Sequence, residues 1–238
     1  MDIPLEIRER ELIVKWLKRN NFINKKFVEV GCGDGFHLEA FSELEMSGTG
    51  IDISDKALGL ARKKRLKRIR ILKYDFLKYQ KKTELVFMLN FLEHVKNDID
   101  YMKKANEILL KEGYLVITIP TNPKAYGYAD INAGHIRRYT RTELERKLDI
   151  AGFKISHSYH IGFPVCDIYT SAFNFIFKSK KTNSKNFESG IRNNTNYYPA
   201  GFNLLSKIFF PILSFLIRLD FMFLHTKFGN HMVLFCKK

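Results

Sequence analysis

The sequence predicts an α/β protein in which a doubly wound parallel sheet is covered by helices on both faces. Short apolar runs alternate with amphipathic helical stretches from residue 27 to residue 119, and this alternation is typical of such sheets. The first apolar run, 27–30, stops at a cluster of glycines, which lets the backbone turn sharply. With 238 residues, 45% hydrophobic and 14% aromatic, the chain can form one elaborated domain with a sizeable core.

Each element follows from its periodicity and from the residues at its ends. The spacing of apolar residues predicts helices at 5–19, 36–46, 55–64, 96–110 and 141–150. Short apolar runs predict strands at 27–30, 48–53, 69–72, 85–89, 114–119 and 153–160, and a last strand at 232–236. Ser54 and Thr140 are the expected N-caps of two helices, because a hydroxyl can accept a hydrogen bond from an orphan amide of the first turn.

The character of the chain changes after Pro120. Residues 121–134 are rich in Gly, Tyr and Asn, and we expect them to form a functional lid. Two strongly apolar segments follow, 161–177 and 202–224, joined by a polar linker at about 178–199 that we expect to be flexible. The predicted domains are therefore a core at 1–160, completed by the terminal strand at 230–237, and an apolar helical insertion at 161–229.

The uncharged stretch 208–217 is too short for a transmembrane helix, which needs about twenty apolar residues. Apolar residues next to Lys and Arg are typical of a helix that lies in a membrane surface. A helical cap over the active site or a dimer contact explains the same pattern, so these alternatives stay open.

Basic residues exceed acidic ones by a formal net charge of +15. Eleven basic residues and one acid lie between Arg62 and Lys82, and six basic residues and one acid lie between Lys178 and Lys207. This balance indicates an anionic partner or surface. The three cysteines are widely spaced, which excludes a disulfide framework or a zinc cluster. The N-terminus has no apolar signal-peptide core, so a cytoplasmic location is the default expectation.

The most informative motif is FVEVGCGDG at 27–35. A dinucleotide-binding loop needs its third glycine at position 36, where this chain has Phe36. The alternate spacing of Gly31, Gly33 and Gly35 favours instead a loop that holds the methionine moiety of S-adenosylmethionine. Asp52 ends the second strand, where a carboxylate can accept from both ribose hydroxyls.

The segments EVGCGDG, GIDIS, YDF, NFLEHV and GHIRRYT-RTELERKLDIAGF resemble the motifs of class I S-adenosylmethionine-dependent methyltransferases, over about 8–160 and the terminal strand. The chain is similar in particular to the LEHV/GHxRRY group, which is described by analogy with quinone-biosynthesis O-methyltransferases. The resemblance implies a Rossmann-like sheet of seven strands with the last one antiparallel, and S-adenosylmethionine as cofactor. Asp75 is expected to accept from the adenine amino group, and Phe76 to lie against the adenine ring. The expected cofactor-binding residues are Glu29, Gly31, Cys32, Gly33, Gly35, Asp52, Ile53, Asp75, Phe76, Leu89 and Asn90.

The candidate catalytic residues follow the fourth and fifth strands, because ligands of doubly wound sheets lie at the carboxyl ends of the strands. They are His135, His94, Arg137 and Arg138. His135 is the first choice for a general base, and the two arginines would suit a carboxylate or phosphate on the acceptor. The alternative is that His135 and the arginines only tie the lid to the sheet.

No metal is expected. In quinone-type relatives an acidic residue three positions before Glu93 helps Glu93 and His94 to hold a divalent ion, and this chain has Asn90 there, a poorer ligand for a hard cation. The alternative role for Glu93 and His94 is to cap the following segment and support the cofactor pocket.

Together these features predict an S-adenosylmethionine-dependent methyltransferase acting on a small lipophilic or anionic acceptor, most simply at oxygen. The expected partners are this acceptor and an anionic membrane surface, on the inner face of the membrane. An RNA methyltransferase is the first alternative, but residues 62–73 carry no aromatic side chains among their basic ones, which disfavours a nucleic-acid groove. A non-catalytic, cofactor-binding partner subunit is the second.

Overall fold

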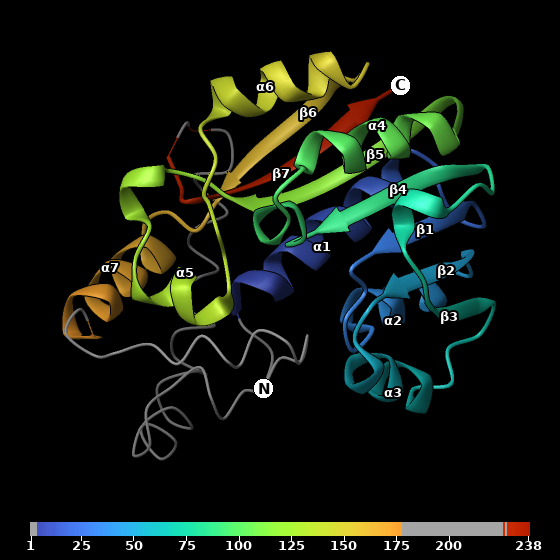
Figure 1. Cartoon of the computed structure of the whole chain (residues 1–238), viewed down its shortest axis with the longest axis horizontal. Helices are drawn as coiled ribbons and strands as arrows, with labels where there is room; N and C mark the ends of the chain where they lie inside the picture. Colours follow the sequence, from blue (N-terminus) through green and yellow to red (C-terminus); the bar gives the residue numbers. More distant parts are fainter. Residues whose placement is uncertain (1–3, 178–225, 227) are drawn as a thin grey trace.

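A mixed sheet of seven strands forms the centre of the molecule (Figure 1). The computed structural model describes residues 4–177, 226 and 228–238. The strand order is β3-β2-β1-β4-β5-β7-β6, and β7 pairs antiparallel with both β5 and β6. The predicted fold class, with its antiparallel last strand, is therefore confirmed. The strands are β1 Lys26–Val30, β2 Ser47–Asp52, β3 Ile69–Lys73, β4 Thr83–Leu89, β5 Leu109–Pro120, β6 Lys154–Ile161 and β7 His231–Lys237.

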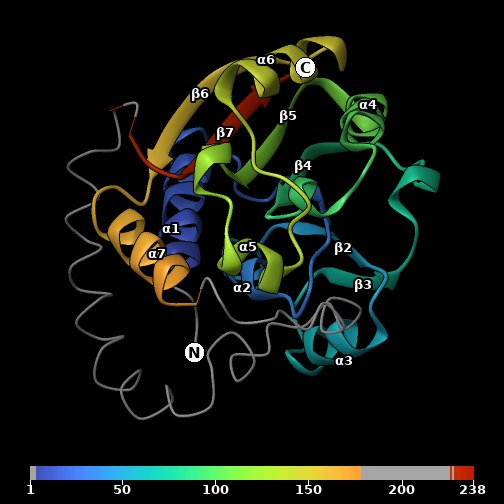
Figure 2. The ribbon, with the colours of Figure 1, turned by 60° about the vertical axis from the view of Figure 1, so that its left-hand side comes forward.

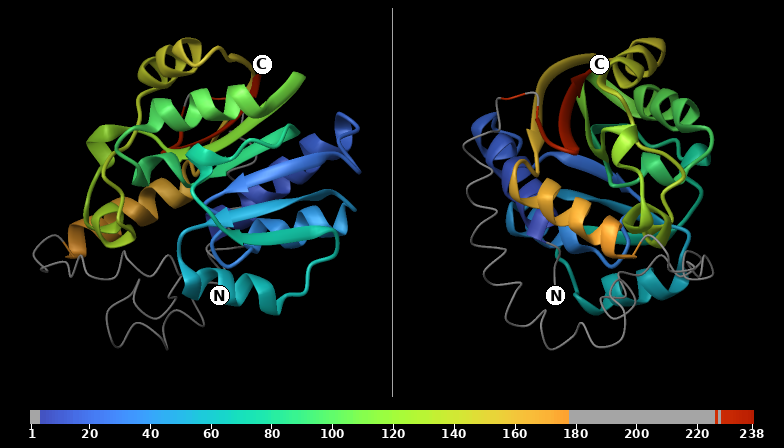
Figure 3. Two further views of the ribbon diagram at one scale, coloured as in Figure 1. Left: turned by 45° about the vertical axis from the view of Figure 1, so that its right-hand side comes forward. Right: turned by 90° about the vertical axis from the view of Figure 1, so that its left-hand side faces the viewer.

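Helices cover both faces of this sheet, as Figure 3 shows for α1 on one side and for α4 and α6 on the other. Neighbouring residues of one strand, such as Phe27 and Val28, belong to two different apolar clusters. Central parallel strands are buried on both faces, which explains why they read as continuous apolar runs. The helices are α1 Pro4–Arg19, α2 Phe36–Glu43, α3 Asp55–Lys63, α4 Asp98–Ile108, α5 Tyr128–Ala133, α6 Arg141–Ile150 and α7 Val165–Phe177; the 3₁₀ turns are η1 Phe76–Lys78, η2 Leu92–His94 and η3 Pro123–Ala125.

The N-caps of α3 and α6 are the two residues that the sequence predicts, Ser54 and Thr140. The Ser54 hydroxyl accepts from the amide of Ala57 at 3.3 Å, and the Thr140 hydroxyl accepts from the amide of Glu143 at 3.1 Å. Each cap satisfies one of the amides that the first turn leaves without a helical partner.

Two predictions about element boundaries were wrong. The predicted helix 96–110 ends at Ile108, and the chain enters β5 at once, because residue 109 already pairs with residue 83 across a register shift. The predicted lid 121–134 is not a plain loop, since it contains η3 and α5. A helix of six residues has too little periodicity to be recognised, and contacts with other parts of the chain hold it.

Helix α7 begins the segment predicted as an apolar insertion, and it lies beside α5 (Figures 1 and 2). The Asn174 side chain accepts from the amide of Ala129 at 2.9 Å and donates to the carbonyl of Ala125 at 3.3 Å. Residues 165–177 are thus joined to the predicted lid. The predicted linker 178–199 and the apolar segment 202–224 lie outside the described residues. Within the described part of the chain, no helix has both the length and the apolar character that crossing a membrane requires.

Candidate active site

The glycine loop after β1 is held against the end of β2. The amides of Gly31 and Cys32 both donate to the carbonyl of Ile51, at 2.8 and 3.0 Å. Gly31 and Gly35 have φ values of 71° and 80°, in the left-handed region that glycine adopts without strain. A Cβ atom on Gly31 would come within 2.5 Å of the Phe91 ring. The loop therefore packs closely against its neighbours. Because glycines occupy these positions, no side chain covers the main chain there.

Asp52 lies directly beside this loop. Its carboxylate accepts from the amide of Gly33 at 2.9 Å and from the amide of Ser54 at 2.8 Å, so both of its oxygens are fixed in place. Each carboxylate oxygen has a second lone pair that a hydroxyl group can use. The next residue, Ile53, is 78% exposed and offers an apolar surface beside the carboxylate. The arrangement fits the ribose and adenine of S-adenosylmethionine, and the contacts themselves stay predictions.

The two residues expected to contact adenine, Asp75 and Phe76, differ in their exposure to solvent. Asp75 is half-exposed and accepts from the amide of Leu77 at 3.0 Å, which caps η1. The Phe76 side chain is only 2% exposed and packs in the core against Tyr79 and Tyr101. A ring with so little exposed surface cannot cover a ligand. Phe76 is therefore a core residue, and the geometry does not support its expected stacking on adenine.

Four further residues predicted to contact the cofactor lie around the loop: Glu29, Cys32, Leu89 and Asn90. Glu29 is 2% exposed and lies in β1. Cys32 is buried, and this burial, together with the nearby Glu29 and Asp52, raises the pKa of its thiol far above the ordinary value. The thiol is thus neutral and part of the packing. Leu89 is 6% exposed at the end of β4 and belongs to the core. Asn90, which follows it, has a φ of 49°, and its amide donates to the Thr118 carbonyl at 3.0 Å.

A cluster of polar side chains lies at the carboxyl ends of β4 and β5. His135 Nδ1 is 2.9 Å from Asp130 Oδ1, and Arg138 Nε donates to the same oxygen at 2.7 Å. On its other side, His135 Nε2 is 3.8 Å from Glu93 Oε1. The ring of His94 is 4.9 Å from that of His135. The structure thus brings together three of the four predicted catalytic residues.

Burial determines the charge of several groups in this cluster. It raises the pKa of the Glu93 carboxyl well above its ordinary value, and the nearby Glu9 and Asp130 add to this. Burial also lowers the pKa of His94 to about 4, with a further contribution from His135. For Asp130, burial alone would raise the pKa, but hydrogen bonds from His135 and Arg138 outweigh it and lower the pKa. Burial therefore favours the neutral acid form of Glu93, and the hydrogen bonds to Asp130 favour its carboxylate form.

The two arginines are engaged within the protein. Arg137 donates to Asp98 at 3.2 Å and to the carbonyl of Lys96 at 2.8 Å. Arg138 is 8% exposed and donates to Asp130 and to the carbonyl of Thr121, the latter at 3.2 Å. These contacts support the alternative in which the pair ties the lid to the sheet. The geometry does not support their expected contact with an anionic acceptor.

Sequence reasoning missed three members of the cluster: Glu9, Asp130 and His231. The Glu9 side chain is fully buried, accepts from Nδ2 of the Asn90 side chain at 2.7 Å and lies 3.6 Å from His231 Nε2. Burial, with smaller effects of Arg138 and His135, lowers the pKa of His231 to about 3. A signal existed for Glu9, because it lies four residues before Ile13 on the apolar side of helix 5–19. No local pattern pointed to the other two.

A divalent ion would find three donors here. Glu93, His94 and His135 each offer one ligand atom, and these atoms lie within 4.8 Å of one another. The side chain of Asn90 donates from Nδ2 to Glu9 and is thus engaged within the protein. Magnesium-like ions prefer several carboxylate and water oxygens, and this set has one carboxyl group. The expectation that no metal is held here stays a prediction.

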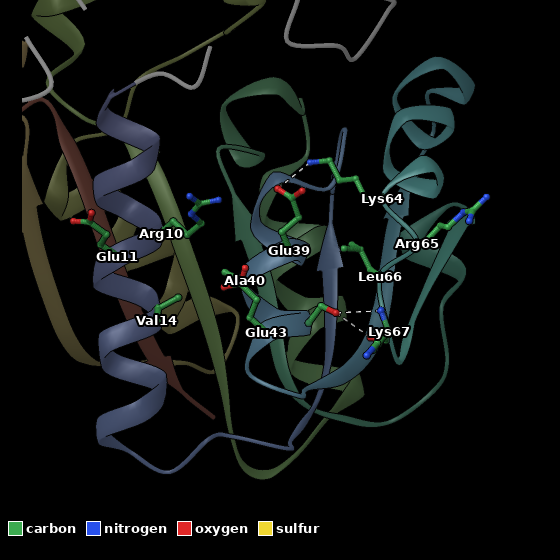
Figure 4. A pocket seen from close by; sticks show the side chains of 11 residues that line it. Arg10, Glu11, Val14, Glu39, Ala40, Glu43, Lys64, Arg65, Leu66 and Lys67 are labelled. Carbon is green, nitrogen blue, oxygen red and sulfur yellow. Dashed lines mark hydrogen bonds and ion pairs between the residues drawn. The ribbon is translucent and has the colours of Figure 1, made fainter. Parts of the chain in front are cut away.

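A separate surface cavity of about 790 Å³ lies between α1, α2 and the segment after α3 (Figure 4). Side chains of both signs line it, among them Arg10, Glu39, Lys64 and Lys67. Lys64 pairs with Glu39 at 3.2 Å across the cavity, as Figure 4 shows. None of the residues predicted to contact the cofactor belongs to its lining. This cavity therefore plays no part in the candidate active site.

The fold and the glycine-loop site together define the class of protein. Residues 5–158 match the family model of a methyltransferase domain, so the chain belongs to this family. It is 32% identical over 148 residues to a ubiquinone biosynthesis O-methyltransferase of Pelagibacter ubique, which covers 57% of the chain and 61% of that protein. A protein of the same name from Pseudomonas aeruginosa is 31% identical over 134 residues, covering 52% and 58%. The chain thus spans about three-fifths of the length of these curated relatives.

Solved structures show the same fold. A methyltransferase from Mesorhizobium loti, described as S-adenosylmethionine-dependent, matches with a TM-score of 0.57 and 16% identity over 90% of the chain and 91% of that protein. A magnesium protoporphyrin IX methyltransferase from Synechocystis with bound SAH matches with a TM-score of 0.56 and 16% identity, over 63% and 74%. S-adenosylmethionine is the cofactor of the methyltransferase family to which this chain belongs.

Proposed function

We propose that this protein is an O-methyltransferase that acts on a hydroxyl group of a small, lipophilic or anionic molecule. One observation carries the proposal: His135 lies between Asp130 and Glu93 at the carboxyl ends of the strands, with 15% of its side chain exposed. A hydroxyl acceptor needs a base to take its proton, and an imidazole paired with a carboxylate is suited to this task. The names of the curated relatives agree with transfer to oxygen.

The cofactor would be held by the glycine loop, by Asp52 and by the exposed side chain of Ile53. It supplies an electrophilic methyl group on a sulfonium sulfur. The chain's own contribution is to bring an acceptor oxygen into line with this group, because positioning supplies most of the rate in such a displacement. As the acceptor oxygen bonds to the methyl carbon, the carbon–sulfur bond breaks and its electron pair stays on sulfur.

The proton of the acceptor hydroxyl would pass to His135 Nε2. Asp130 would stabilise the imidazolium that forms, and Arg138 would keep Asp130 ionised. Burial disfavours the charged form of Glu93, so this residue would compete less with His135 for the proton of the acceptor. This division of roles follows from the distances and the pKa shifts of the cluster.

Replacing the base tests the proposed function. His135→Asn should lower turnover about 10²–10⁴-fold, measured as release of S-adenosylhomocysteine with a panel of catechols that do or do not carry a prenyl chain. Binding of S-adenosylmethionine, measured by calorimetry, should change less than about twofold. His157→Asn, on the exposed face of β6, is the matched control. Normal turnover of His135→Asn would refute the assignment of the base.

We also propose that α7 brings the site to an anionic membrane surface. Ile168 and Phe175 are 67% and 82% exposed, and with Ala172 between them they follow helical spacing along one side of α7. In the sequence, Lys178, Lys180 and Lys181 come directly after this helix. Exposed apolar side chains next to lysines suit an interface of anionic headgroups and acyl chains. Such docking would give a lipophilic acceptor a short path to the site.

A further inference from the structure

Asp130 is the centre of the hydrogen bonds that shape the segment between β5 and α6. Its side chain has no exposed surface, and its carboxylate accepts from three donors. These are the amide of Gly127 at 2.9 Å, His135 Nδ1 at 2.9 Å and Arg138 Nε at 2.7 Å. The Asp130 carbonyl also accepts from the amide of His135 at 2.9 Å. Both the main chain and the ring of His135 are therefore fixed by one residue.

The carboxylate also determines which ring nitrogen of His135 carries the hydrogen. An ionised carboxylate can only accept hydrogen bonds. Arg138 donates to the same oxygen as His135, which favours the ionised form. The nitrogen next to Asp130 must then be Nδ1–H, and the lone pair of the neutral ring is left on Nε2. That nitrogen lies on the side of Glu93, 3.8 Å from its carboxyl oxygen.

Hydrogen bonds of the same segment connect the His135 ring to the sheet. Arg138 joins Asp130 to the carbonyl of Thr121, immediately after β5. The amide of Ile136 donates to the carbonyl of Glu93 at 2.9 Å, which joins the segment to η2. Helix α5 has only six residues and cannot hold this geometry by its own stability. The hydrogen bonds of Asp130 therefore decide where His135 lies.

We propose that Asp130 is a positioning residue that holds His135 as the Nδ1–H tautomer and thereby makes Nε2 the nitrogen that accepts the acceptor's proton. The proton moves from the acceptor hydroxyl to Nε2, the ring becomes an imidazolium, and Asp130 stays ionised throughout. The consequence for turnover rests on the proposed function of His135. The tautomer itself does not, so it can be tested without a known acceptor.

The test uses the whole protein labelled with ¹⁵N at histidine. Long-range ¹H–¹⁵N correlation spectra distinguish a protonated ring nitrogen from one with a lone pair, and His135→Asn identifies the signals of His135 among the seven histidines. In the unsubstituted protein, at a pH where the His135 ring carries one proton, we expect Nδ1 protonated and Nε2 unprotonated. The Nε2–H tautomer there would overturn the proposal, whatever any variant does.

Asp130→Ala removes the carboxylate that accepts from Nδ1. Because no acceptor then favours Nδ1–H, we expect His135 to populate the Nε2–H tautomer, with turnover about 10²–10⁴-fold lower. Affinity for S-adenosylmethionine should stay within about twofold, and Asp149→Ala, exposed on α6, should leave tautomer and turnover unchanged. An unchanged tautomer in Asp130→Ala would overturn the proposal. A changed tautomer with normal turnover would support the positioning role and refute the base.

Discussion

At the scale of single residues, the cofactor site depends on backbone geometry that few residues can adopt. A side chain on Gly31 would be strained by its positive φ and would meet the Phe91 ring. The loop in turn presents the amide of Gly33 to Asp52, so the loop and the carboxylate hold each other in place. Ile53 then stays exposed, although residues of this type are usually buried. These features are what the predicted contacts of this turn with the cofactor require.

Asp52→Asn tests this description. The amide can replace one accepted hydrogen bond but not both, and it loses the charge that strengthens bonds from the ribose hydroxyls. We expect the affinity for S-adenosylmethionine to fall about 10- to 100-fold, which corresponds to roughly 1.4–2.8 kcal/mol. Calorimetry measures this, with Asp55→Asn in the exposed first turn of α3 as the control. Equal affinity of the two variants would contradict the role of Asp52.

At the scale of elements, the part of the chain over the site is built from short pieces that depend on each other. Helix α5 is anchored on one side by Asp130 and on the other by Asn174 of α7. Asn174 makes its hydrogen bonds from the side of α7 that faces α5. Ile168 and Phe175 are exposed on α7. An outward apolar side next to the site is what a protein needs to approach a lipid surface.

The membrane proposal is tested on that outward side. Ile168→Asp combined with Phe175→Asp should reduce co-sedimentation with phosphatidylglycerol-containing vesicles about tenfold or more, since burying each side chain contributes roughly 1.5–3 kcal/mol. Ile150→Asp, at the exposed end of α6 and 47% exposed in the native chain, is the control. Neutral phosphatidylcholine vesicles should bind less of the unsubstituted protein. If the double variant still binds anionic vesicles as well as the control does, α7 is not the docking element.

At the scale of the whole molecule, the basic run from Arg62 to Lys82 lies apart from the candidate catalytic cluster. The basic run from Arg62 to Lys82 includes β3, which is the edge strand of the sheet. Some of these basic residues form ion pairs, Lys64 with Glu39 and Lys73 with Asp55. The polar cluster with His135 lies instead at β4, β5 and β7, on the other side of β1 in the strand order. The basic run from Arg62 to Lys82 therefore lies apart from the polar cluster with His135.

The buried histidines should make the stability depend on pH. His94 and His231 have folded-state pKa values of about 4 and about 3, below the ordinary value of 6.5. Their stabilising effect is therefore complete above about pH 6.5 and is lost as the pH falls, at about 1.4 kcal/mol per unit for each group. Glu93 acts in the opposite direction above pH 4.5, because its folded-state pKa is raised. The net effect is a loss of stability on acidification.

His231→Gln isolates one of these contributions. The difference in unfolding free energy between the unsubstituted protein and this variant should shrink by about 1.4 kcal/mol per pH unit from pH 6.5 down to pH 4. Urea unfolding at several pH values measures it. For Gln80→Ala, at an exposed position without a titratable group, the difference should stay constant. A constant difference for His231→Gln as well would show that this imidazole can be protonated in the folded protein.

The amino-acid sequence by itself determined the succession of strands and helices, the caps at Ser54 and Thr140, and the glycine loop with Asp52. These features are encoded locally, by periodicity and by residues a few positions apart. Segments whose shape depends on distant partners were not predictable: the entry into β5, the helix inside the expected lid, and the burial of Phe76.

The tertiary structure decided which residues form the candidate catalytic cluster. Glu9 and Asn90 are 81 residues apart, and His231 joins them from the last strand. Asp130 lies next to His135 only because α5 and the segment after it fold so that the Asp130 carboxylate accepts from His135, Arg138 and the amide of Gly127. Hydrogen bonds and desolvation of this kind depend on distance in space, which local sequence patterns do not contain. The sequence therefore determined the cofactor and the fold, and only the folded chain decided the environment of His135.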